Sequence, residues 1–230
     1  MFGGKAKVPM VLRTEGGVGR CIAAHHSESL EAWLMHAPGL YVVMPATPYE
    51  AKGLLKAAIR SDNPVVFIEH KATYGQLGPV PEGDYIVPLG VADIKRTGSD
   101  ATIVSYSRMA MRSLEAARTL AEDYGIDAEV IDLRTLKPLD IRTVAESVRK
   151  TGRLITVSEG FCWCGAGREI AGQYMEYDFG DGTRGFDYLD ARPVNLAARD
   201  VPPPMSEPLE EASIPSVQEI VDAVRQTVGQ

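Results

Sequence analysis

The sequence predicts an α/β protein with parallel sheets covered by helices, and three features favour that class. Short apolar, β-branched runs alternate with helical patterns along the 230-residue chain. The runs Val42–Met44 and Val65–Ile68 lack polar alternation, which is typical of strands covered on both faces. Apolar residues make up 45% and charged residues 24% of the chain, the balance of a folded globular protein and not of a disordered one.

The first segment, residues 1–74, is expected to hold three strands and two helices. Its β-branched runs predict strands at Val8–Leu12, Leu40–Met44 and Pro64–Ile68, and its helical patterns are Ser29–His36 and Thr47–Arg60. The second helix opens with a capping threonine, a proline in the first turn and a glutamate three residues after the threonine. A buried parallel sheet of three strands leaves two bare edges and an uncovered face, so this segment requires cover from further polypeptide or from a partner.

Residues 75–90 contain four glycines and three prolines without periodicity, and are interpreted as a linker between two domains. The segment 91–230 that follows is expected to hold four strands and about four helices, enough for a separate domain. The expected strands are Thr102–Tyr106, Ala128–Leu133, Leu154–Val157 and Val194–Ala197. The helices identified are Arg108–Tyr124 and Asp140–Lys150, each followed by a terminating glycine, and Ser216–Val228.

Composition excludes several classes of function. With 24 Lys and Arg against 31 Asp and Glu, the net charge is −7 and the pI is about 5.2, so nucleic-acid binding is not expected. No apolar run approaches the roughly 18 to 20 residues that span a bilayer, and no secretory signal or other targeting segment is visible. Three cysteines do not form a disulfide framework, so a reducing compartment, a bacterial cytoplasm or an organelle matrix, is expected.

Chemically capable residues gather at several junctions, but none of them alone identifies a reaction. His25 and His26 precede a helix, and histidine as a residue type can transfer protons near neutral pH, so they fit either a catalytic role or a solvated helix start. The glycine-rich stretch Glu15–Gly19 lacks the spacing of a phosphate-binding motif and is interpreted as a tight turn. Glu69–Lys71 closes a strand, where it fits either a functional site or an interdomain salt bridge.

Two further segments have a functional and a structural interpretation. The helix end Ala58–Pro64 exposes carbonyl oxygens that suit a cation, although solvated carbonyls are more common there. The spacing of Cys162–Cys164 fits neither a redox motif nor a zinc site, and a packed aromatic turn at the end of a strand is expected.

Several longer stretches of the sequence resemble those of a known protein family. They include Lys7–Thr14, His26–Trp33, His36–Leu40, Thr47–Leu55, Asp62–His70, Glu129–Asp140, Phe186–Ala191 and Asp200–Pro202. The chain resembles the beta subunit of the thiamine-diphosphate-dependent first component of 2-oxoacid dehydrogenase complexes, over essentially all 230 residues. The resemblance implies part of a pyrimidine-binding transketolase-like α/β domain over 1–74, a linker over 75–90, and a transketolase C-terminal-like α/β domain over 91–230.

The resemblance also implies functional residues. His26 falls on the catalytic histidine of the family's beta chain, which is thought to serve proton transfer when the lipoyl group is acylated. Five residues fall on positions that hold a structural potassium ion in some members: Met10, Ala58, Ile59, Ser61 and Asn63. Ser61 replaces an aspartate of those members, which removes a charge from the potassium site.

The expected activity is oxidative decarboxylation of a 2-oxoacid, pyruvate first, and acyl transfer to a lipoyl-bearing acyltransferase core. The expected assembly is a heterotetramer of two alpha and two beta chains, in which thiamine diphosphate lies between alpha and beta and the alpha subunit holds the diphosphate and magnesium. An acetoin or branched-chain 2-oxoacid dehydrogenase beta subunit is an alternative, and so is a non-catalytic module that docks to other subunits.

The chain departs from the family pattern at three places. Met1–Gly4 matches an internal phrase of the family, so the family's amino-terminal third is expected to be absent from this sequence. That third carries the glutamate and the aromatic residue that contact the thiamine pyrimidine in the family, and no residue here is assigned either role. The chain alone is therefore expected to be inactive. Cys162–Cys164 replaces a glycine-rich phrase, and Tyr177–Gly185 is expected to be an inserted surface loop.

Overall fold

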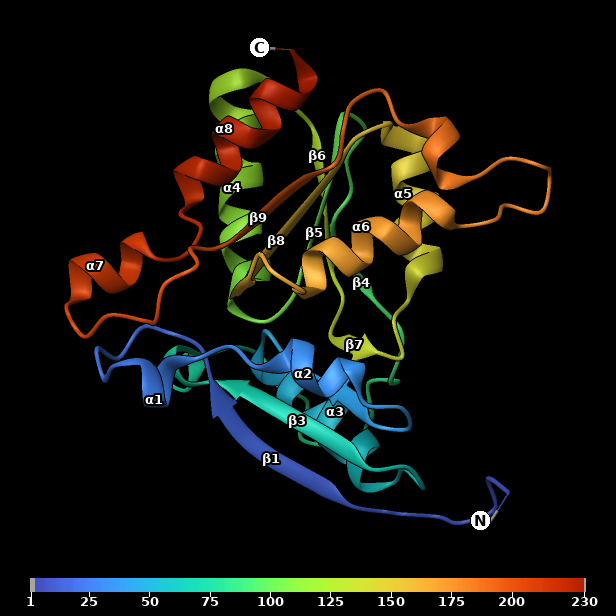
Figure 1. Cartoon of the computed structure of the whole chain (residues 1–230), viewed down its shortest axis with the longest axis vertical. Helices are drawn as coiled ribbons and strands as arrows, with labels where there is room; N and C mark the ends of the chain where they lie inside the picture. The colour runs from blue at the N-terminus through green and yellow to red at the C-terminus, as the bar shows by residue number, and fades with distance from the viewer. Residues whose placement is uncertain (1–2, 230) are drawn as a thin grey trace.

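The computed structural model describes residues 3–229. They form two separate sheets, one in the lower and one in the upper part of Figure 1. The first sheet has the order β1-β3-β2-β7, with β1 (Val11–Gly16), β2 (Tyr41–Val43) and β3 (Val65–His70) parallel and β7 (Thr135–Lys137) antiparallel to β2. The second sheet has the order β4-β6-β5-β8-β9. Its strands are β4 (Asp93–Arg96), β5 (Ala101–Ser105), β6 (Ala128–Asp132), β8 (Leu154–Phe161) and β9 (Val194–Ala198), all parallel except β4.

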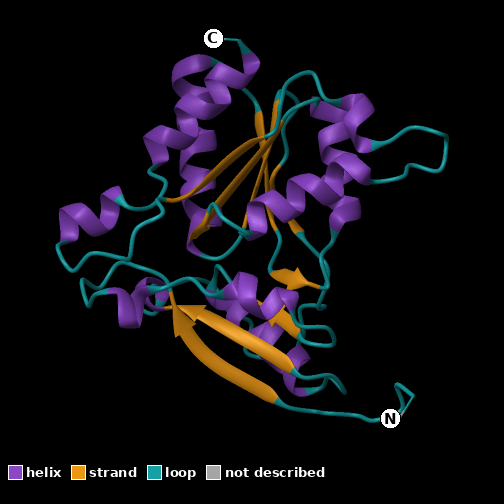
Figure 2. Cartoon of the chain, in the orientation of Figure 1, coloured by secondary structure: helices purple, strands orange, loops and turns teal. Residues whose placement is uncertain are grey.

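Helices cover both faces of the second sheet (Figures 1 and 2). The helices α4 (Arg108–Tyr124) and α8 (Val217–Val228) lie on one face, and α5 (Ile141–Thr151) and α6 (Ala166–Glu176) lie on the other. Shorter helices are α1 (Ala24–Ser27), α2 (Glu31–His36), α7 (Glu207–Ala212), and the 3₁₀ turns η1 (Lys71–Thr73) and η2 (Gly185–Tyr188). The predicted α/β class is therefore confirmed.

We call residues 3–74 the first unit and residues 91–229 the second unit. One face of the first sheet packs against helix α3 (Pro48–Ile59), and the other face packs against the second unit. The α3 face is a small core of Val43, Leu54 and Phe67. The opposite face, which includes Val42 and Ile68, packs into one apolar cluster with residues of the second unit. The two units therefore share a core.

The structure corrects the expectation that the first sheet has two bare edges. The edge at β2 is covered by β7, which comes from the second half of the chain and which the sequence did not reveal because it is only three residues long. At the other edge, no strand within residues 3–229 pairs with the outer side of β1, and Leu12 on this strand is 53% exposed. Strand β4 and helices α6 and α7 were also missed, since three of the four β4 residues are charged and α6 has a glycine-containing start.

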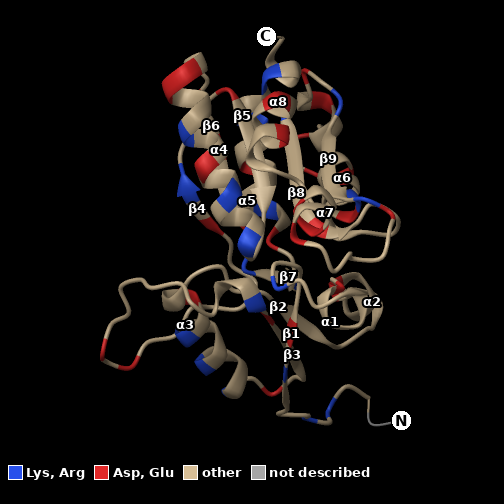
Figure 3. Ribbon diagram, turned by 90° about the vertical axis from the view of Figure 1, so that its left-hand side faces the viewer, with Lys and Arg blue, Asp and Glu red and all other residues tan. Residues whose placement is uncertain are grey.

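Residues 75–90 contain no helix or strand, as expected, and pack in part against α3, where Tyr85 stacks on Tyr49. Basic and acidic residues are interspersed over the ribbon in Figure 3. Within residues 3–229, no helix has both the length and the apolar character needed to span a bilayer.

Candidate functional site

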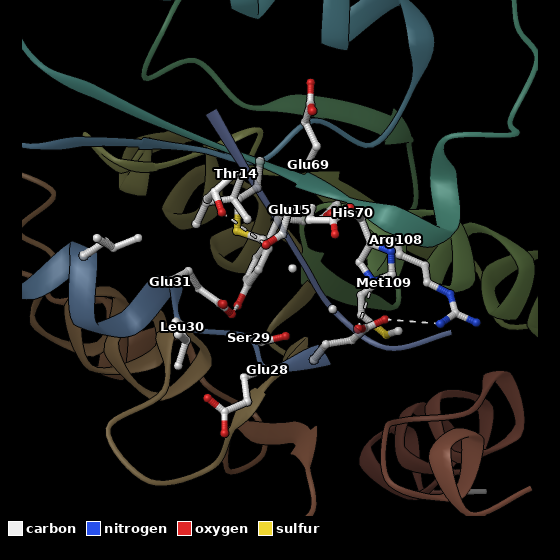
Figure 4. Close-up of a pocket in the computed structure, with 18 of the residues that line it drawn as sticks. Thr14, Glu15, Glu28, Ser29, Leu30, Glu31, Glu69, His70, Arg108 and Met109 are labelled. Atoms are coloured by element: carbon white, nitrogen blue, oxygen red, sulfur yellow. Dashed lines mark hydrogen bonds and ion pairs between the residues drawn. The ribbon is translucent and has the colours of Figure 1, made fainter. Parts of the chain in front are cut away.

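A cavity of about 190 Å³ lies where the two units meet (Figure 4). Its walls come from the carboxyl ends of β1 and β3 in the first unit, and from the residues that follow β5 and the end of β8 in the second. Helix α2 and the residues before it complete the wall. Because ligands of open α/β sheets bind outside the carboxyl ends of the strands, this junction is the candidate functional site of the chain.

Glu31 at the start of α2 is a buried carboxyl in the cavity wall. Its Oε1 accepts a hydrogen bond of 2.7 Å from the Tyr106 hydroxyl across the boundary between the units, and its Oε2 is buried with no hydrogen-bond partner among residues 3–229. Burial raises the pKa of Glu31, and burial together with the Glu31 carboxyl raises the pKa of Tyr106 well above its usual range. Both shifts favour the neutral, protonated form of the side chain.

His70 and Glu159 form a second buried contact across the same boundary. The His70 Nδ1 accepts from the Ala72 N–H at 3.2 Å, which leaves Nε2 to donate to Glu159 Oε2 at 2.9 Å. The same carboxylate oxygen accepts from the Val18 N–H at 3.2 Å, and Arg108 lies 3.6 Å from Oε1. Burial raises the pKa of Glu159, but the contacts with His70, Arg108 and Val18 outweigh it and lower the pKa, so this carboxyl is ionised.

The structure places His26 in the short helix α1, outside the cavity lining. Its ring lies 4.1 Å from the ring of His25, centroid to centroid, and both side chains are exposed. The residues that follow, Glu28 to Glu31, lead directly into the cavity wall. His26 is therefore accessible to a molecule that approaches from outside this chain.

The glycine-rich turn does not fit a diphosphate. The Val18 N–H is used by Glu159, and the Gly17 N–H faces the Glu28 carbonyl oxygen at 3.4 Å, so these donors are engaged within the chain. Gly17 has φ +82°, and a Cβ there would lie 2.2 Å from His70 Nε2. Within residues 3–229, no group of three or more His, Cys, Asp or Glu could hold a metal ion. The Gly17 and Val18 N–H groups are therefore not free to bind a diphosphate.

The five residues of the predicted potassium site lie in one corner of the first unit. The Met10 carbonyl accepts from the Val65 N–H at 2.8 Å, and the Ala58 carbonyl accepts from the Ser61 N–H at 3.1 Å. The Asn63 side chain donates to the Tyr41 hydroxyl at 3.0 Å, and Ile59 is exposed at the end of α3. Since a carbonyl oxygen has two lone pairs, these carbonyls retain acceptor capacity for an ion.

Two predictions at the strand ends have different outcomes. The prediction of a packed aromatic turn at Cys162–Cys164 is wrong, because Trp163 is 72% exposed; Phe161, not Trp163, packs against the core. At Glu69–Lys71, His70 makes a hydrogen bond to Glu159 of the second unit, while Glu69 pairs with Arg13 at 2.7 Å on its own sheet.

Sequence reasoning missed Glu31, Tyr106 and Glu159 as site residues. A signal was present for two of them, since Tyr106 follows β5 directly and Glu159 lies near the end of β8, where parallel strands position functional groups. Glu31 had no such signal, because its place in an amphipathic helix is typical of a solvated charge.

Comparison with family models identifies both parts of the chain. Residues 1–76 match the pyrimidine-binding domain of transketolase, and residues 90–220 match the transketolase C-terminal domain.

Two relatives are similar in sequence over almost the whole chain. Pyruvate dehydrogenase E1 component subunit beta of Rhizobium meliloti is 48% identical over 226 residues, which are 98% of this chain and 47% of that protein. The beta subunit of acetoin:2,6-dichlorophenolindophenol oxidoreductase of Cupriavidus necator is 47% identical over 99% of this chain and 65% of that protein. The chain thus spans about half to two thirds of the length of these relatives.

A solved structure shares the fold. A split-gene transketolase, an inactive beta4 tetramer, superposes with a TM-score of 0.74 at 25% identity, over 96% of this chain and 67% of that one.

Proposed function

The chain belongs to the family of beta subunits of thiamine-diphosphate-dependent 2-oxoacid dehydrogenases, and on this basis we propose that it is the beta-subunit portion of a pyruvate dehydrogenase. The observation that carries the proposal is the 48% identity to a pyruvate dehydrogenase beta subunit over 226 residues. Acetoin dehydrogenase is the second candidate, because the acetoin-type relative is 47% identical. Branched-chain 2-oxoacids form the third.

The proposed partners follow from what the described residues lack. An alpha subunit would hold the diphosphate and magnesium, since the Gly17 and Val18 N–H groups of the glycine-rich turn are engaged within the chain. Two alpha and two beta chains would form the complex, and the lipoyl group of an acyltransferase would receive the acyl group. The decarboxylation chemistry comes from the bound thiamine, and none of it is assigned to residues described here.

We assign His26 to acyl transfer. Its imidazole is exposed on α1 and can meet a lipoyl arm that arrives from another subunit. As the S–S bond of the dithiolane breaks, one sulfur takes up a proton, and an imidazole titrates in the range needed to donate it. The corner around Met10, Ala58, Ile59, Ser61 and Asn63 is proposed to hold potassium through carbonyl oxygens, which suit this ion.

The function is tested by reconstitution. The chain is purified with an alpha subunit, thiamine diphosphate, magnesium and a dye acceptor, and given pyruvate, acetoin or 3-methyl-2-oxobutanoate. A second preparation carries the preceding segment of a full-length relative fused ahead of residue 1. We expect turnover of pyruvate only in the fusion, because loss of a positioned acid–base group lowers a rate by about 10²–10⁴-fold. Turnover by the unfused chain near that of the fusion contradicts the expected inactivity, and preference for acetoin selects the second candidate.

The role of His26 is tested in the same fusion. His26→Ala should slow acyl transfer to lipoyl groups at least tenfold more than decarboxylation with the dye acceptor. His25→Ala is the matched control, because the two exposed rings are neighbours on α1. Equal losses in both assays, or a larger effect of His25→Ala, would favour a structural role at the start of the helix.

A further inference from the structure

The backbone that leads into helix α1 adopts an unfavourable conformation. Cys21 and Ala23 have φ +55° and +67°, which lie in the left-handed region that residues with a Cβ disfavour. Ala23 is the N-cap of α1 and provides no side-chain cap, and the helix has only four residues. Such a turn persists only where contacts from the surrounding fold hold it in place.

The position of His26 depends on this turn. Its imidazole is exposed, and its backbone N–H donates to the Ala23 carbonyl oxygen at 3.2 Å. The first turn of α1 is therefore built directly on the left-handed residues that precede it. A change in the backbone of Cys21 or Ala23 would move α1, and His26 with it.

Glu210 holds the turn from the second unit. Its Oε2 accepts from the Cys21 N–H at 3.0 Å, and the Cys21 Sγ lies 3.4 Å from the same oxygen. A thiol keeps its proton at neutral pH, so the sulfur donates as well. Glu210 is 1% exposed and belongs to α7, which lies on the same side of the molecule as α1 in Figure 1.

Helix α7 is itself fastened to the second unit, because Glu211 pairs with Arg108 of α4 at 2.8 Å. Two further contacts anchor the loop before α1. The Val18 N–H donates to a buried carboxylate at 3.2 Å, and the Arg20 guanidinium donates to a backbone carbonyl at 3.3 Å. Both of these residues are farther from His26 along the chain than the residue that α7 holds.

We propose that Glu210 is a positioning residue for His26, because its hydrogen bonds to Cys21 hold the left-handed turn that sets α1 and the imidazole in place. Glu210 acts through the backbone and does not touch the lipoyl group. The inference rests on the proposed role of His26 in acyl transfer. Since a misplacement of about 1 Å can lower a rate by about 10²-fold, loss of this anchor should slow acyl transfer.

The test compares reach with charge in the fusion used for His26. Glu210→Gln keeps the length of the side chain and an acceptor oxygen, whereas Glu210→Asp keeps the charge and withdraws both oxygens by one methylene. We expect Glu210→Gln to retain acyl transfer within about threefold, and Glu210→Asp to slow it about tenfold more than decarboxylation with the dye acceptor. Glu207→Ala, at an exposed position of the same helix, is the matched control and should behave like the natural chain. Loss of acyl transfer in Glu210→Gln but not in Glu210→Asp would overturn the proposal.

A second measurement follows His26 without any cofactor. The four histidines of the chain are labelled with ¹³C at Cε1, and the NMR signal of His26 is identified by its loss in His26→Ala. We expect Glu210→Asp to shift or broaden this signal, and Glu210→Gln and Glu207→Ala to leave it in place.

The two measurements separate this inference from the proposed function. An unchanged His26 signal in Glu210→Asp would overturn the positioning role, whatever the rates are. A shifted signal, with acyl transfer unchanged in both Glu210→Asp and His26→Ala, would support the positioning role and contradict the assignment of His26 to acyl transfer.

Discussion

Two buried glutamates at the boundary between the units respond to their surroundings in opposite directions. Burial raises the pKa of Glu31, whereas at Glu159 the contacts with His70 and Arg108 outweigh burial and lower the pKa. Since a raised folded-state pKa favours the protonated form, the stabilisation from Glu31 is present below about pH 4.5 and is lost as pH rises toward the raised value.

Glu31→Gln should therefore stabilise the chain at alkaline pH. Glutamine still accepts from the Tyr106 hydroxyl but has no charge to bury. We expect the Tm of this variant to exceed that of the natural chain by about 2–4 °C at pH 8, which corresponds to a gain of about 1 kcal/mol in the free energy of unfolding for a chain of this size. The gain in Tm should be smaller at pH 5. Calorimetry at both values measures it, with the exposed Glu146→Gln as control. A Tm gain that is equal at pH 5 and pH 8 would contradict the buried-carboxyl argument.

Gly17 is the residue whose substitution should most disturb the boundary. An alanine there would adopt φ +82° and would place Cβ 2.2 Å from His70 Nε2, which moves His70 away from Glu159. Left-handed strain costs about 1–2 kcal/mol, and displacement of the buried pair adds to it. We expect Gly17→Ala to lower the free energy of unfolding by about 3 kcal/mol, measured by urea titration. Gly75→Ala, whose Cβ meets nothing within 4 Å, should change it by less than about 0.5 kcal/mol.

At the scale of elements, two helices begin with the same capping box but in different surroundings. In α3 the box is Thr47 with Glu50, and in α8 it is Ser216 with Glu219. Glu50 is fully buried and also pairs with Lys95 and Arg134 of the second unit, whereas the side chain of Glu219 is 49% exposed. The start of α3 therefore also links the two units.

Glu50→Gln should destabilise the chain far more than Glu219→Gln. Glutamine can still cap either helix, so the difference reports the buried charge. Asp93 continues to pair with Lys95 and Arg134, which keeps the loss below the 3–5 kcal/mol of a fully orphaned charge. We expect about 2 kcal/mol for Glu50→Gln and under about 0.5 kcal/mol for Glu219→Gln, by thermal unfolding. Equal losses would show that Glu50 acts as a cap only.

Elements with a strong local signal could be predicted from the sequence, and those defined by partners could not. The pattern of α4 and its terminal Gly125 predicted the observed bounds, Arg108–Tyr124. In contrast, the three residues of β7 form a strand only because β2 lies beside them. The same distinction applies to the site, because the unit boundary that buries Glu31 brings together residues 75 positions apart.

At the scale of the whole molecule, we expect the exposed segment 75–90 to be cleaved while the shared core keeps the two fragments together. Glu82 lies in an exposed stretch outside any helix or strand, so a glutamate-specific protease should cut there first. The fragments 1–82 and 83–230 should stay together at pH 7, because the apolar cluster and the carboxylates of Glu50 and Glu159 join them.

The nicked pair should separate in acid. The pKa values of Glu50 and Glu159 are lowered in the folded chain, so their stabilisation is present above about pH 4.5 and is lost as pH falls below it. Size-exclusion chromatography at pH 7 and pH 3.5 measures this. Separation already at pH 7 would show that the covalent connection through residues 75–90, and not the interface, holds the units together.

The position of β7 has a consequence for synthesis on the ribosome. The first sheet is made early, yet its fourth strand is residues 135–137, which emerge only after β4, β5, α4 and β6. A nascent chain that ends before residue 135 exposes the β2 edge and the apolar face that later joins the second unit. Domains usually fold in order as they emerge, but the first unit cannot complete its sheet until residues 135–137 have been synthesised. A nascent chain stalled before residue 135 should therefore expose a surface that chaperones bind.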